Sequence, residues 1–413
     1  MNVTLAILGL ALLVLLHEAG HFFIARAVGM SPRKFYLGFP PALVRLRRKG
    51  IEYGIGVVPL GGYVKIPGMH RPAPSDLDVQ FGPAVSEQPQ VFPKVARVKR
   101  ALERSDFADA REELAPLKEA LAEAELSHPA SRAARRGLNE LEDGLSEDAY
   151  WRQRTWKRVA VIFAGPGMNI VIALVFVAIA YSLGLPGNPM PVVKKVEPGK
   201  PAAVIGLRPG DEIVAINSRV TSNFAEVRNA IQASHGRRLR VTVQRVVGGN
   251  TIQFRLKAAK PVRLKAGRYI LGFEPKATVD RYGFVGSISH SLDDNWRAVH
   301  LTVTALPRLL ERSGRKQVSG PVGIVHVSSE AASFSFPVFL EILGLLSISL
   351  ALLNLLPLLP LDGGHILFSL VEGIRRRAVG REIYERVSVV GIALFLILLF
   401  IGLSNDINRL HGG

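Results

Sequence analysis

The sequence contains no cysteine among its 413 residues. Disulfides and cysteine-based zinc sites are therefore excluded, and any metal site must use histidine, aspartate or glutamate. The first apolar run also lacks two marks of a removable signal peptide, because no Lys or Arg precedes it and no small-residue cleavage pattern follows it. We therefore expect this run to be retained as a membrane helix.

Acidic residues are few, since 34 Asp and Glu stand against 52 Lys and Arg and give a formal net charge of +18. Such an excess is typical of proteins that bind nucleic acid or an anionic membrane surface. The sequence has no helix-turn-helix, zinc knuckle or aromatic RNA-binding motif, so membrane lipid is the predicted partner and nucleic acid is not. The chain length predicts two or three structural units.

Four mostly apolar stretches reach or approach the length of about 20 residues that crosses a bilayer as a helix. They run roughly over residues 3–24, 159–185, 336–361 and 387–403, and the last is short. The pattern predicts an α-helical polytopic membrane protein with about four transmembrane helices.

Basic residues cluster in the loops after the first stretch, before the second, and between the third and fourth. Examples are Arg45, Arg47, Arg48, Arg154, Lys157, Arg158, Arg375, Arg376 and Arg377. The positive-inside rule places these loops in the cytosol and puts the N-terminus, residues 186–335 and the C-terminus outside. We therefore expect a multi-pass plasma-membrane protein.

The first apolar stretch contains His17-Glu18-Ala-Gly-His21. On a helix His17 and His21 share one face and can hold one metal ion, while Glu18 can act as general base toward a water at that metal. An HExxH sequence also arises by chance. Such a copy would rarely fall inside a spanning helix, where ionisable side chains are costly, so a metal site is favoured.

Catalytic zinc usually has three protein ligands, and the best third ligand is Asp362 in Asn354-Leu-Leu-Pro-Leu-Leu-Pro-Leu-Asp362-Gly-Gly. The prolines and glycines break the helix there and allow a carboxylate to turn inward. The orientation above puts Asp362 and His17 on the same, cytosolic side. His365 and Glu341 are rival ligands, and Asp362 could also be a simple helix terminator.

These two motifs resemble the site-2 protease family, the intramembrane zinc metalloproteases. Further segments are similar to its bacterial, PDZ-containing, RseP-type branch. They are Leu60-Gly-Gly-Tyr63-Val-Lys65, Trp156-Lys-Arg, Gly165-Pro-Gly-Met-Asn169 and Ser319-Gly-Pro-Val-Gly323. The matches follow one another in order along most of the chain except residues 70–150.

The resemblance implies one Zn²⁺ per chain with His17, His21 and Asp362 as ligands, Glu18 as catalytic base and Asn354 as a substrate-binding residue. Asn354 could instead be an interhelical hydrogen bonder. The family cleaves transmembrane segments, so the implied substrates are anti-sigma factors or remnant signal peptides in regulated intramembrane proteolysis. The implied location is the bacterial inner membrane, with the active site toward the cytosol.

The resemblance implies that two further regions of the chain assist the proteolysis. Residues 33–68 contain two strand-like runs around Lys49-Gly50, which predict a membrane-associated β-hairpin. Its edge could pair with an unwound substrate, or the hairpin could only pack on the bilayer. Residues 190–275 resemble a circularly permuted α+β PDZ domain, outside the membrane, which could bind a peptide or exclude substrates with bulky outer domains.

The predicted order along the chain has eight parts. These are transmembrane helix 1 (1–28), the hairpin region (33–68), a linker plus cytosolic helical insertion (70–150), helix 2 (156–186), the PDZ domain (190–275), an interfacial amphipathic linker (281–335), helix 3 with the LDGG motif (336–365) and helix 4 (386–405). Within the insertion, the Pro-rich and polar stretch 71–90 predicts a linker.

The predicted enzyme has two rivals of other classes. A catalytically silent scaffold that sequesters partners would not need His17, Glu18, His21, Asp362 and Asn354 in lipid. A zinc transporter would need polar residues along a complete path, and the second and fourth apolar stretches offer almost none.

Overall fold

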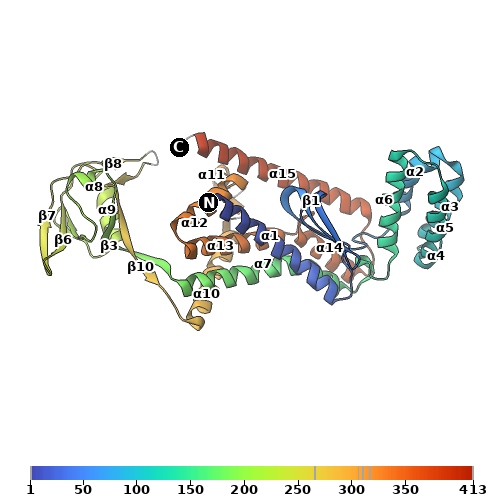
Figure 1. Cartoon of the computed structure of the whole chain (residues 1–413), viewed down its shortest axis with the longest axis horizontal. Helices are drawn as coiled ribbons and strands as arrows, with labels where there is room; N and C mark the ends of the chain where they lie inside the picture. The colour runs from blue at the N-terminus through green and yellow to red at the C-terminus, as the bar shows by residue number, and fades with distance from the viewer. Residues whose placement is uncertain (1, 265–266, 306, 309–310, 316–317, 412–413) are drawn as a thin grey trace. The chain divides into compact units, whose positions relative to one another are not determined.

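The computed structural model describes residues 2–264, 267–305, 307–308, 311–315 and 318–411 (Figure 1). The chain divides into two compact units. Unit 1 comprises Met1–Leu174, Asp294–Ser329 and Leu343–Leu403, and unit 2 comprises Val175–Asp293, Glu330–Ile342 and Ser404–Gly413.

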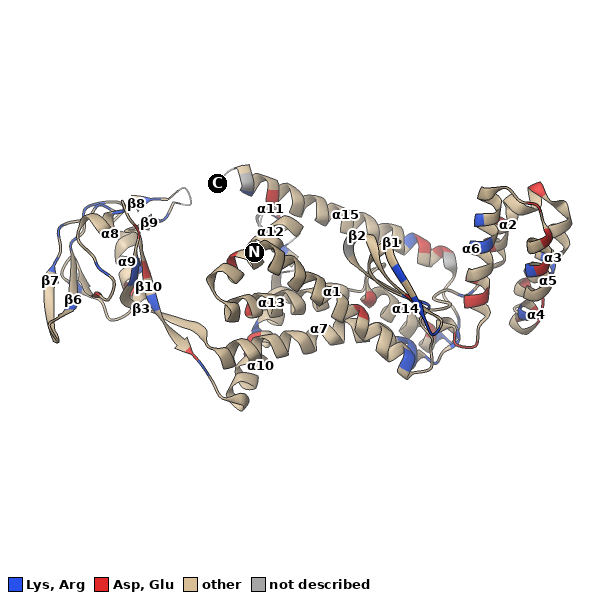
Figure 2. Cartoon of the chain, viewed as in Figure 1, with Lys and Arg blue, Asp and Glu red and all other residues tan. Residues whose placement is uncertain are grey.

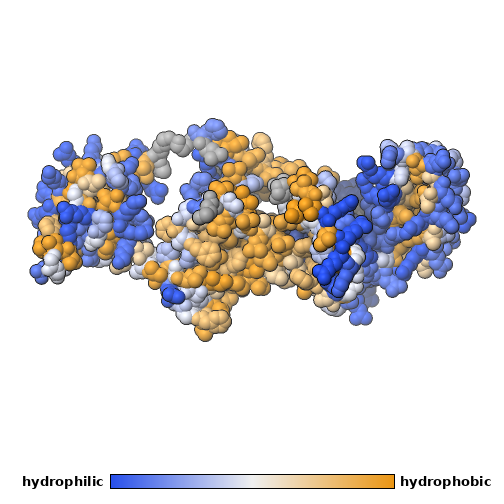
Figure 3. Space-filling model, in the orientation of Figure 1, coloured by the Kyte–Doolittle hydropathy of each residue, from blue (hydrophilic) through white to orange (hydrophobic). Residues whose placement is uncertain are grey.

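Four helices of the described chain are long and apolar enough to cross a membrane: α1 (Asn2–Ala27), α7 (Thr155–Leu183), α13 (Phe336–Asn354) and α15 (Arg381–His411). Large apolar side chains on α15, such as Phe395, Leu396 and Phe400, are more than half exposed. Figure 3 shows apolar residues over these helices, and Figure 2 shows few charges on α1 and α13. Because a water-soluble chain would bury such surface, the molecule is a membrane protein.

The third apolar helix is shorter than the sequence pattern predicts. Helix α13 ends at Asn354, and a separate helix, α14 (Asp362–Arg375), begins where the predicted span ends. Pro357 and Pro360 lie between them, so the apolar run to Leu361 is partly irregular backbone and not one continuous helix.

Residues 34–65 form strands β1 (Lys34–Arg48) and β2 (Ile51–Lys65), which pair through a turn at Lys49 and Gly50. Both turn residues have positive φ, 48° and 78°. The first part of β1, Lys34–Leu37, pairs with Glu52–Ile55 on one side and with Gly62–Lys65 on the other. The two long strands therefore bend into a small sheet in which Gly62–Lys65 is an edge.

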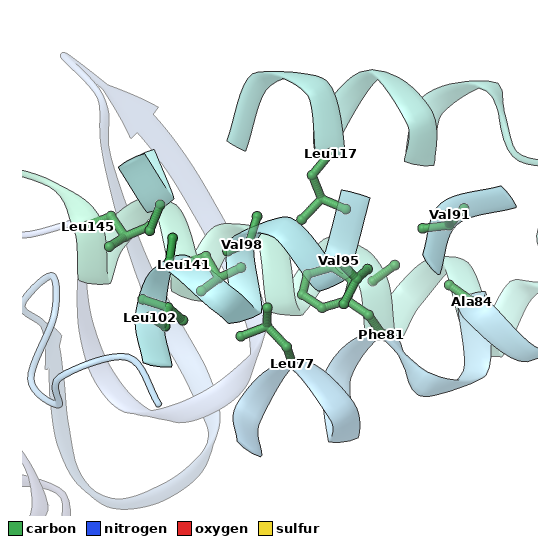
Figure 4. Packing of buried hydrophobic residues seen from close by; sticks show 13 residues of the cluster. Leu77, Phe81, Ala84, Val91, Val95, Val98, Leu102, Leu117, Leu141 and Leu145 are labelled. Carbon is green, nitrogen blue, oxygen red and sulfur yellow. The ribbon is translucent and has the colours of Figure 1, made fainter. Parts of the chain in front are cut away.

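A helical module follows the sheet. It consists of α2 (Pro74–Glu87), η1 (Pro89–Val91), α3 (Phe92–Glu103), α4 (Phe107–Glu112), α5 (Leu114–Glu123) and α6 (His128–Leu145), and the short η2 (Tyr150–Arg152) leads to α7. Its own apolar core joins α2, α3, α5 and α6, with side chains that point toward one another in Figure 4. Figure 2 shows charged residues of both signs along the helices of this module.

The linker predicted over residues 71–90 is wrong, because α2 occupies most of it. Pro74 stands in the first turn, where a missing N–H is harmless. Leu77, Phe81 and Ala84 recur at helical spacing and are fully buried against the module's core. A composition rich in proline and polar residues therefore concealed an amphipathic helix whose apolar face is supplied by only a few residues.

Ion pairs connect the helical module to the sheet at the start of β1 and the end of β2. The Asp143 carboxylate lies 2.9 Å from Arg33 Nε and 2.5 Å from Lys65 Nζ. Arg33 also contacts Asp148, and the Trp151 indole N–H donates to the carbonyl of Gly144 at 2.7 Å. The end of α6 is thus joined to the residue before β1 and to the last residue of β2, which is part of the Gly62–Lys65 edge.

Unit 2 contains a six-stranded sheet with the order β10-β3-β4-β6-β7, and β5 pairs with β4. The strands are β3 (Leu185–Val196), β4 (Glu212–Ile216), β5 (Arg219–Val220), β6 (Val241–Val247), β7 (Asn250–Arg255) and β10 (Phe273–Asp280), and β8 (Val262–Arg263) pairs separately with β9 (Tyr269–Ile270). Helices α8 (Pro201–Val204) and α9 (Phe224–Ala233) share an apolar core with this sheet. Asn223 caps α9 by accepting from the Glu226 amide at 2.9 Å.

The segment predicted as an interfacial linker is largely helical. It contains α10 (Phe284–Ala305), α11 (Arg312–Arg315) and α12 (Pro321–Phe334). Helix α10 ends at Ala305, and within the predicted linker (281–335) Leu306, Leu309 and Leu310 are among the residues that lie outside the described part of the chain.

Candidate metal centre

Helix α1 holds both histidines of the motif on one face, as the four-residue spacing requires. His17 and His21 are each 7% exposed. Their Nε2 atoms are 3.2 Å apart, and the rings meet edge to face with centroids 4.9 Å apart. Two ring nitrogens therefore converge on one point from a single helix.

The carboxylate of Asp362 reaches the same point from α14. Its Oδ2 atom lies 3.2 Å from His17 Nε2 and 3.5 Å from His21 Nε2. Asp362 is in the first turn of α14, where the helix dipole favours a negative charge. The chain leaves helical conformation between Asn354 and Asp362, and the carboxylate of Asp362 lies beside both histidines.

Two glycines explain why the chain can turn so tightly before α14. A Cβ on Gly363 would lie 2.2 Å from the carbonyl oxygen of Leu355, and one on Gly364 would lie 2.6 Å from the amide nitrogen of Leu359. Neither contact is tolerated by a real side chain, so only glycine lets the 355–361 segment fold back against the first turn of α14.

The three side chains fit a zinc ion. Ligand atoms held about 2.0–2.2 Å from a tetrahedral zinc lie about 3.3–3.6 Å apart, which is close to the separations above. Asp362 Oδ2 is buried and accepts no hydrogen bond of good geometry within the described part of the chain. A buried, unpaired carboxylate oxygen is costly, and a metal ion at this point would satisfy it.

Helix α7 packs against the imidazole rings of both histidines. His21 Nδ1 is 2.8 Å from the carbonyl oxygen of Val161, and His17 Nδ1 is 3.1 Å from the side-chain amide of Asn169. Between these two residues, a Cβ on Gly165 would lie 2.2 Å from His21 Nε2 and 2.8 Å from His17 Nε2. Val161, Gly165 and Asn169 are four residues apart and form one stripe along α7.

Glu18 faces the sheet. A Cβ on Gly62 of β2 would lie 2.1 Å from Glu18 Cγ and 2.9 Å from its Oε1. The edge Gly62–Lys65 therefore passes directly beside the carboxylate that the motif offers as general base. A substrate strand on that edge would lie next to Glu18.

The rival ligands are not part of this cluster. Among the described residues, the group of three possible ligands contains only His17, His21 and Asp362. His365 instead contacts the Tyr384 hydroxyl through its Nδ1 at 3.3 Å. Glu341 lies on α13 within unit 2.

Asn354 is the last residue of α13 and is half-buried. Within the described chain its side chain makes no hydrogen bond, so its amide is available to another molecule. The structure gives no contact between Asn354 and the three ligands.

Sequence reasoning did not assign roles to Gly62, Gly165 or Asn169. All three stand in segments quoted for their family resemblance. Their functions depend on contacts between helix α1 and elements that lie far away in the sequence, and such contacts leave no periodic signal. The four-residue spacing of Gly165 and Asn169 places them on one face of an apolar helix, but it does not show which element that face contacts.

The centre has the composition of a metalloprotease site, with two histidines and a glutamate from an HExxH motif and the carboxylate of Asp362 beside the histidines. The profile of peptidase family M50 matches residues 5–398, so the chain belongs to this family, the site-2 proteases. The resemblance inferred from the motifs is thereby confirmed.

Similar proteins carry the corresponding names. The zinc metalloprotease RasP of Bacillus licheniformis is 28% identical over 99% of this chain and 100% of its own length. Proteins of Brucella suis (28% identical; 96% of this chain, 93% of the relative) and Campylobacter jejuni (27%; 98% and 93%) are also named as zinc metalloproteases. The chain is a metalloprotease, and its cofactor is Zn²⁺.

Proposed function

We propose that this chain is an endopeptidase that cleaves transmembrane segments of membrane proteins, of the anti-sigma factor or remnant signal-peptide type, in regulated intramembrane proteolysis. The observation that carries the proposal is the position of the three ligands. His17 and His21 lie within an apolar helix long enough to span a bilayer, and Asp362 joins them from the first turn of α14, directly after the irregular segment that follows another such helix. A water-soluble substrate has no access to such a depth.

His17, His21 and Asp362 would hold the zinc ion and leave one position open. A zinc ion held there supplies Lewis-acid chemistry, since it acidifies a water molecule and polarises a carbonyl oxygen. Glu18 takes the proton of the attacking water and delivers it to the departing amine of the scissile peptide.

Asn354 binds the substrate in this proposal. Its amide offers one acceptor and two donors, and no group in the described part of the chain uses them. A peptide bond pulled out of a helix exposes one carbonyl and one N–H that need such partners. The side chain is therefore suited to hold the substrate backbone near the end of α13.

The edge Gly62–Lys65 holds the substrate in an extended, strand-like conformation. One side of this segment pairs with Lys34–Leu37, and no strand of the described chain pairs with its other side. Strand addition at a free edge supplies hydrogen bonds to an unwound peptide and compensates for those lost from its helix. Contact between Gly62 and Glu18 supports this edge as the place where the substrate meets the base.

Residues 190–275 act as a PDZ domain outside the membrane. The sheet of unit 2 with α8 and α9 supports this assignment, because short strands around two helices are the parts of such a domain. Two roles follow from it, capture of a peptide end or exclusion of substrates that retain a bulky outer domain. The basic loops support a cytosolic location for the active-site side and for the helical module.

The test is cleavage of a tagged single-span anti-sigma-type or signal-peptide reporter by the purified full-length protein in detergent. Wild type is compared with Glu18→Gln, which keeps the ligands, and with Asp362→Ala, which removes one. Glu341→Gln is the matched control, because it neutralises a carboxylate on another spanning helix without touching the cluster. A zinc chelator is added to a parallel wild-type sample.

We expect cleavage by wild type and Glu341→Gln, loss of about 10²–10⁴-fold in rate with Glu18→Gln, and loss with chelator. Equal cleavage by Glu18→Gln and wild type would refute the mechanism. A wild-type protein that binds its reporters and zinc but cleaves none of them would instead favour a scaffold.

A further inference from the structure

Each metal-ligating histidine has a second ring nitrogen that is turned toward α7. His21 Nδ1 lies 2.8 Å from the carbonyl oxygen of Val161. A carbonyl can only accept, so His21 Nδ1 carries the proton and donates it. The other ring nitrogen, Nε2, then keeps its lone pair for the metal.

The contact of His17 is built differently. His17 Nδ1 lies 3.1 Å from Nδ2 of Asn169, which is fully buried. An NH₂ group at this place donates, so His17 Nδ1 would be the acceptor and His17 Nε2 would carry the proton. That proton would point at His21 Nε2 and Asp362 Oδ2, 3.2 Å away in both cases, and would prevent ligation.

The other atom of the same amide is left without a partner. Asn169 Oδ1 is buried and accepts no hydrogen bond within the described part of the chain. Oxygen and nitrogen of an amide have nearly the same shape, so their assignment follows from the hydrogen-bond network. Exchanging them by a half-turn of the amide brings Oδ1 to His17 Nδ1 and gives this oxygen its donor.

We propose that Asn169 is a positioning residue of the metal centre whose Oδ1 accepts the Nδ1 proton of His17. The bond selects the tautomer in which His17 Nε2 is free to bind the metal, as the Val161 carbonyl does for His21. This inference rests on the proposed zinc site. It adds the group that fixes the tautomer of His17, one of the three proposed ligands.

The surroundings hold Asn169 in place for this role. Ser347 of α13 donates from its hydroxyl to the backbone carbonyl of Asn169 at 2.8 Å, and Ser347 is fully buried. Gly165, one turn earlier on α7, lets this helix approach the imidazoles closely. The amide therefore projects from a fixed backbone toward the ring that it orients.

Two substitutions separate the two amide orientations. Asn169→Asp offers only acceptor oxygens when ionised and keeps the shape of the side chain, so it preserves the proposed bond. Asn169→Leu has a similar size and can neither accept nor donate. Asn295→Leu, at a buried asparagine of α10 outside the metal cluster, controls for the loss of any buried amide.

Zinc affinity is measured on the purified full-length protein by competition with a chelating indicator, and Co²⁺ substitution reports the ligand field by its visible spectrum. We expect Asn169→Leu to bind zinc about 10- to 100-fold more weakly than wild type and to alter the Co²⁺ spectrum. Asn169→Asp and Asn295→Leu should keep wild-type affinity or, for the aspartate, exceed it.

Loss of affinity with Asn169→Asp would overturn the proposal, because it would mean that the amide NH₂ is needed as a donor. Wild-type affinity and spectrum in Asn169→Leu would overturn it as well. If the leucine variant does not fold, the aspartate variant still decides. A wild-type protein that takes up no zinc would refute the zinc site itself, a result distinct from any difference among variants.

Discussion

Two glycines at the metal centre each lie against a different functional group, one against the histidines and the other against the glutamate of the motif. Gly165 of α7 leaves room for both imidazoles, whereas Gly62 of β2 leaves room for Glu18 alone. Cβ atoms essentially never approach other heavy atoms to within 3.0 Å, and both positions would require much shorter contacts. A single methyl group can therefore disturb either the ligands or the base, and the two effects can be measured independently.

Gly165→Ala should weaken zinc binding by on the order of 10- to 100-fold, because the new methyl group displaces the His21 and His17 nitrogens. Alanine raises helix propensity, so loss of the helix is not the cause. Gly167→Ala, on the same helix, is the control, since its Cβ would approach only the ring of Phe163 at 3.3 Å. Bound zinc is measured by mass spectrometry after dialysis against a chelator, and equal retention in both variants would contradict the assignment.

Gly62→Ala should keep its zinc and lose turnover, by about 10²–10⁴-fold, because Glu18 is pushed from its position. The double variant Gly62→Ala/Glu18→Gln should be no slower than Glu18→Gln alone, since both changes remove the same group. Reporter cleavage and metal content are measured on the same preparations. Additive losses in the double variant would show that Gly62 acts elsewhere.

At the scale of elements, the sequence predicted those features that repeat within one segment. The apolar runs of α1, α7, α13 and α15 and the four-residue spacing of His17 and His21 are of this kind. Helix α2 was missed because its composition suggested a linker, and only packing against α6 reveals its buried face. The roles of Gly62, Gly165 and Asn169 arise from contacts between separate elements, which one sequence does not encode locally.

The sheet formed by β1 and β2 depends on a buried carboxylate. Glu52, 5% exposed, accepts a hydrogen bond from the hydroxyl of Tyr36, and it lies 3.0 Å from Arg47 Nε and 3.4 Å from Lys34 Nζ. The Tyr36 hydroxyl first, and then the cations, lower the pKa of Glu52 from 4.5 to about 2. Protonation of this group would leave the cations and the hydroxyl without their partner.

This shift makes the sheet sensitive to acid. Because the folded pKa lies below the unfolded value, the stabilisation is complete above about pH 4.5 and is lost as the pH falls toward 2. Glu52→Gln should therefore speed amide hydrogen exchange in residues 51–65 at pH 7, and the difference from wild type should shrink as the pH approaches 2. Exposed Glu119→Gln is the control, and identical exchange of Glu52→Gln and wild type at pH 7 would contradict the account.

At the scale of the whole molecule, the chain combines a membrane-embedded centre with two regions that have their own apolar cores. One is the module of α2–α6, and the other is the sheet of residues 185–280 with α8 and α9. In the proposed orientation, the positive-inside rule predicts that these two regions lie on opposite sides of the membrane. The module would then meet the cytosolic product, and the sheet would meet the outer end of the substrate.

The absence of cysteine makes this orientation directly measurable. Glu119 in the module and Arg228 in the outer sheet region are exposed, and each can be replaced by the only cysteine of the chain. A membrane-impermeant maleimide should label Arg228→Cys once the outer envelope is opened and Glu119→Cys only after the inner membrane is permeabilised, while the parent chain stays unlabelled. The reverse pattern would invert the topology and place His17 near the outer surface. A protease that cleaves such membrane segments from the cytosolic side must have its metal centre toward the cytosol. That result would therefore also contradict the proposed substrate class.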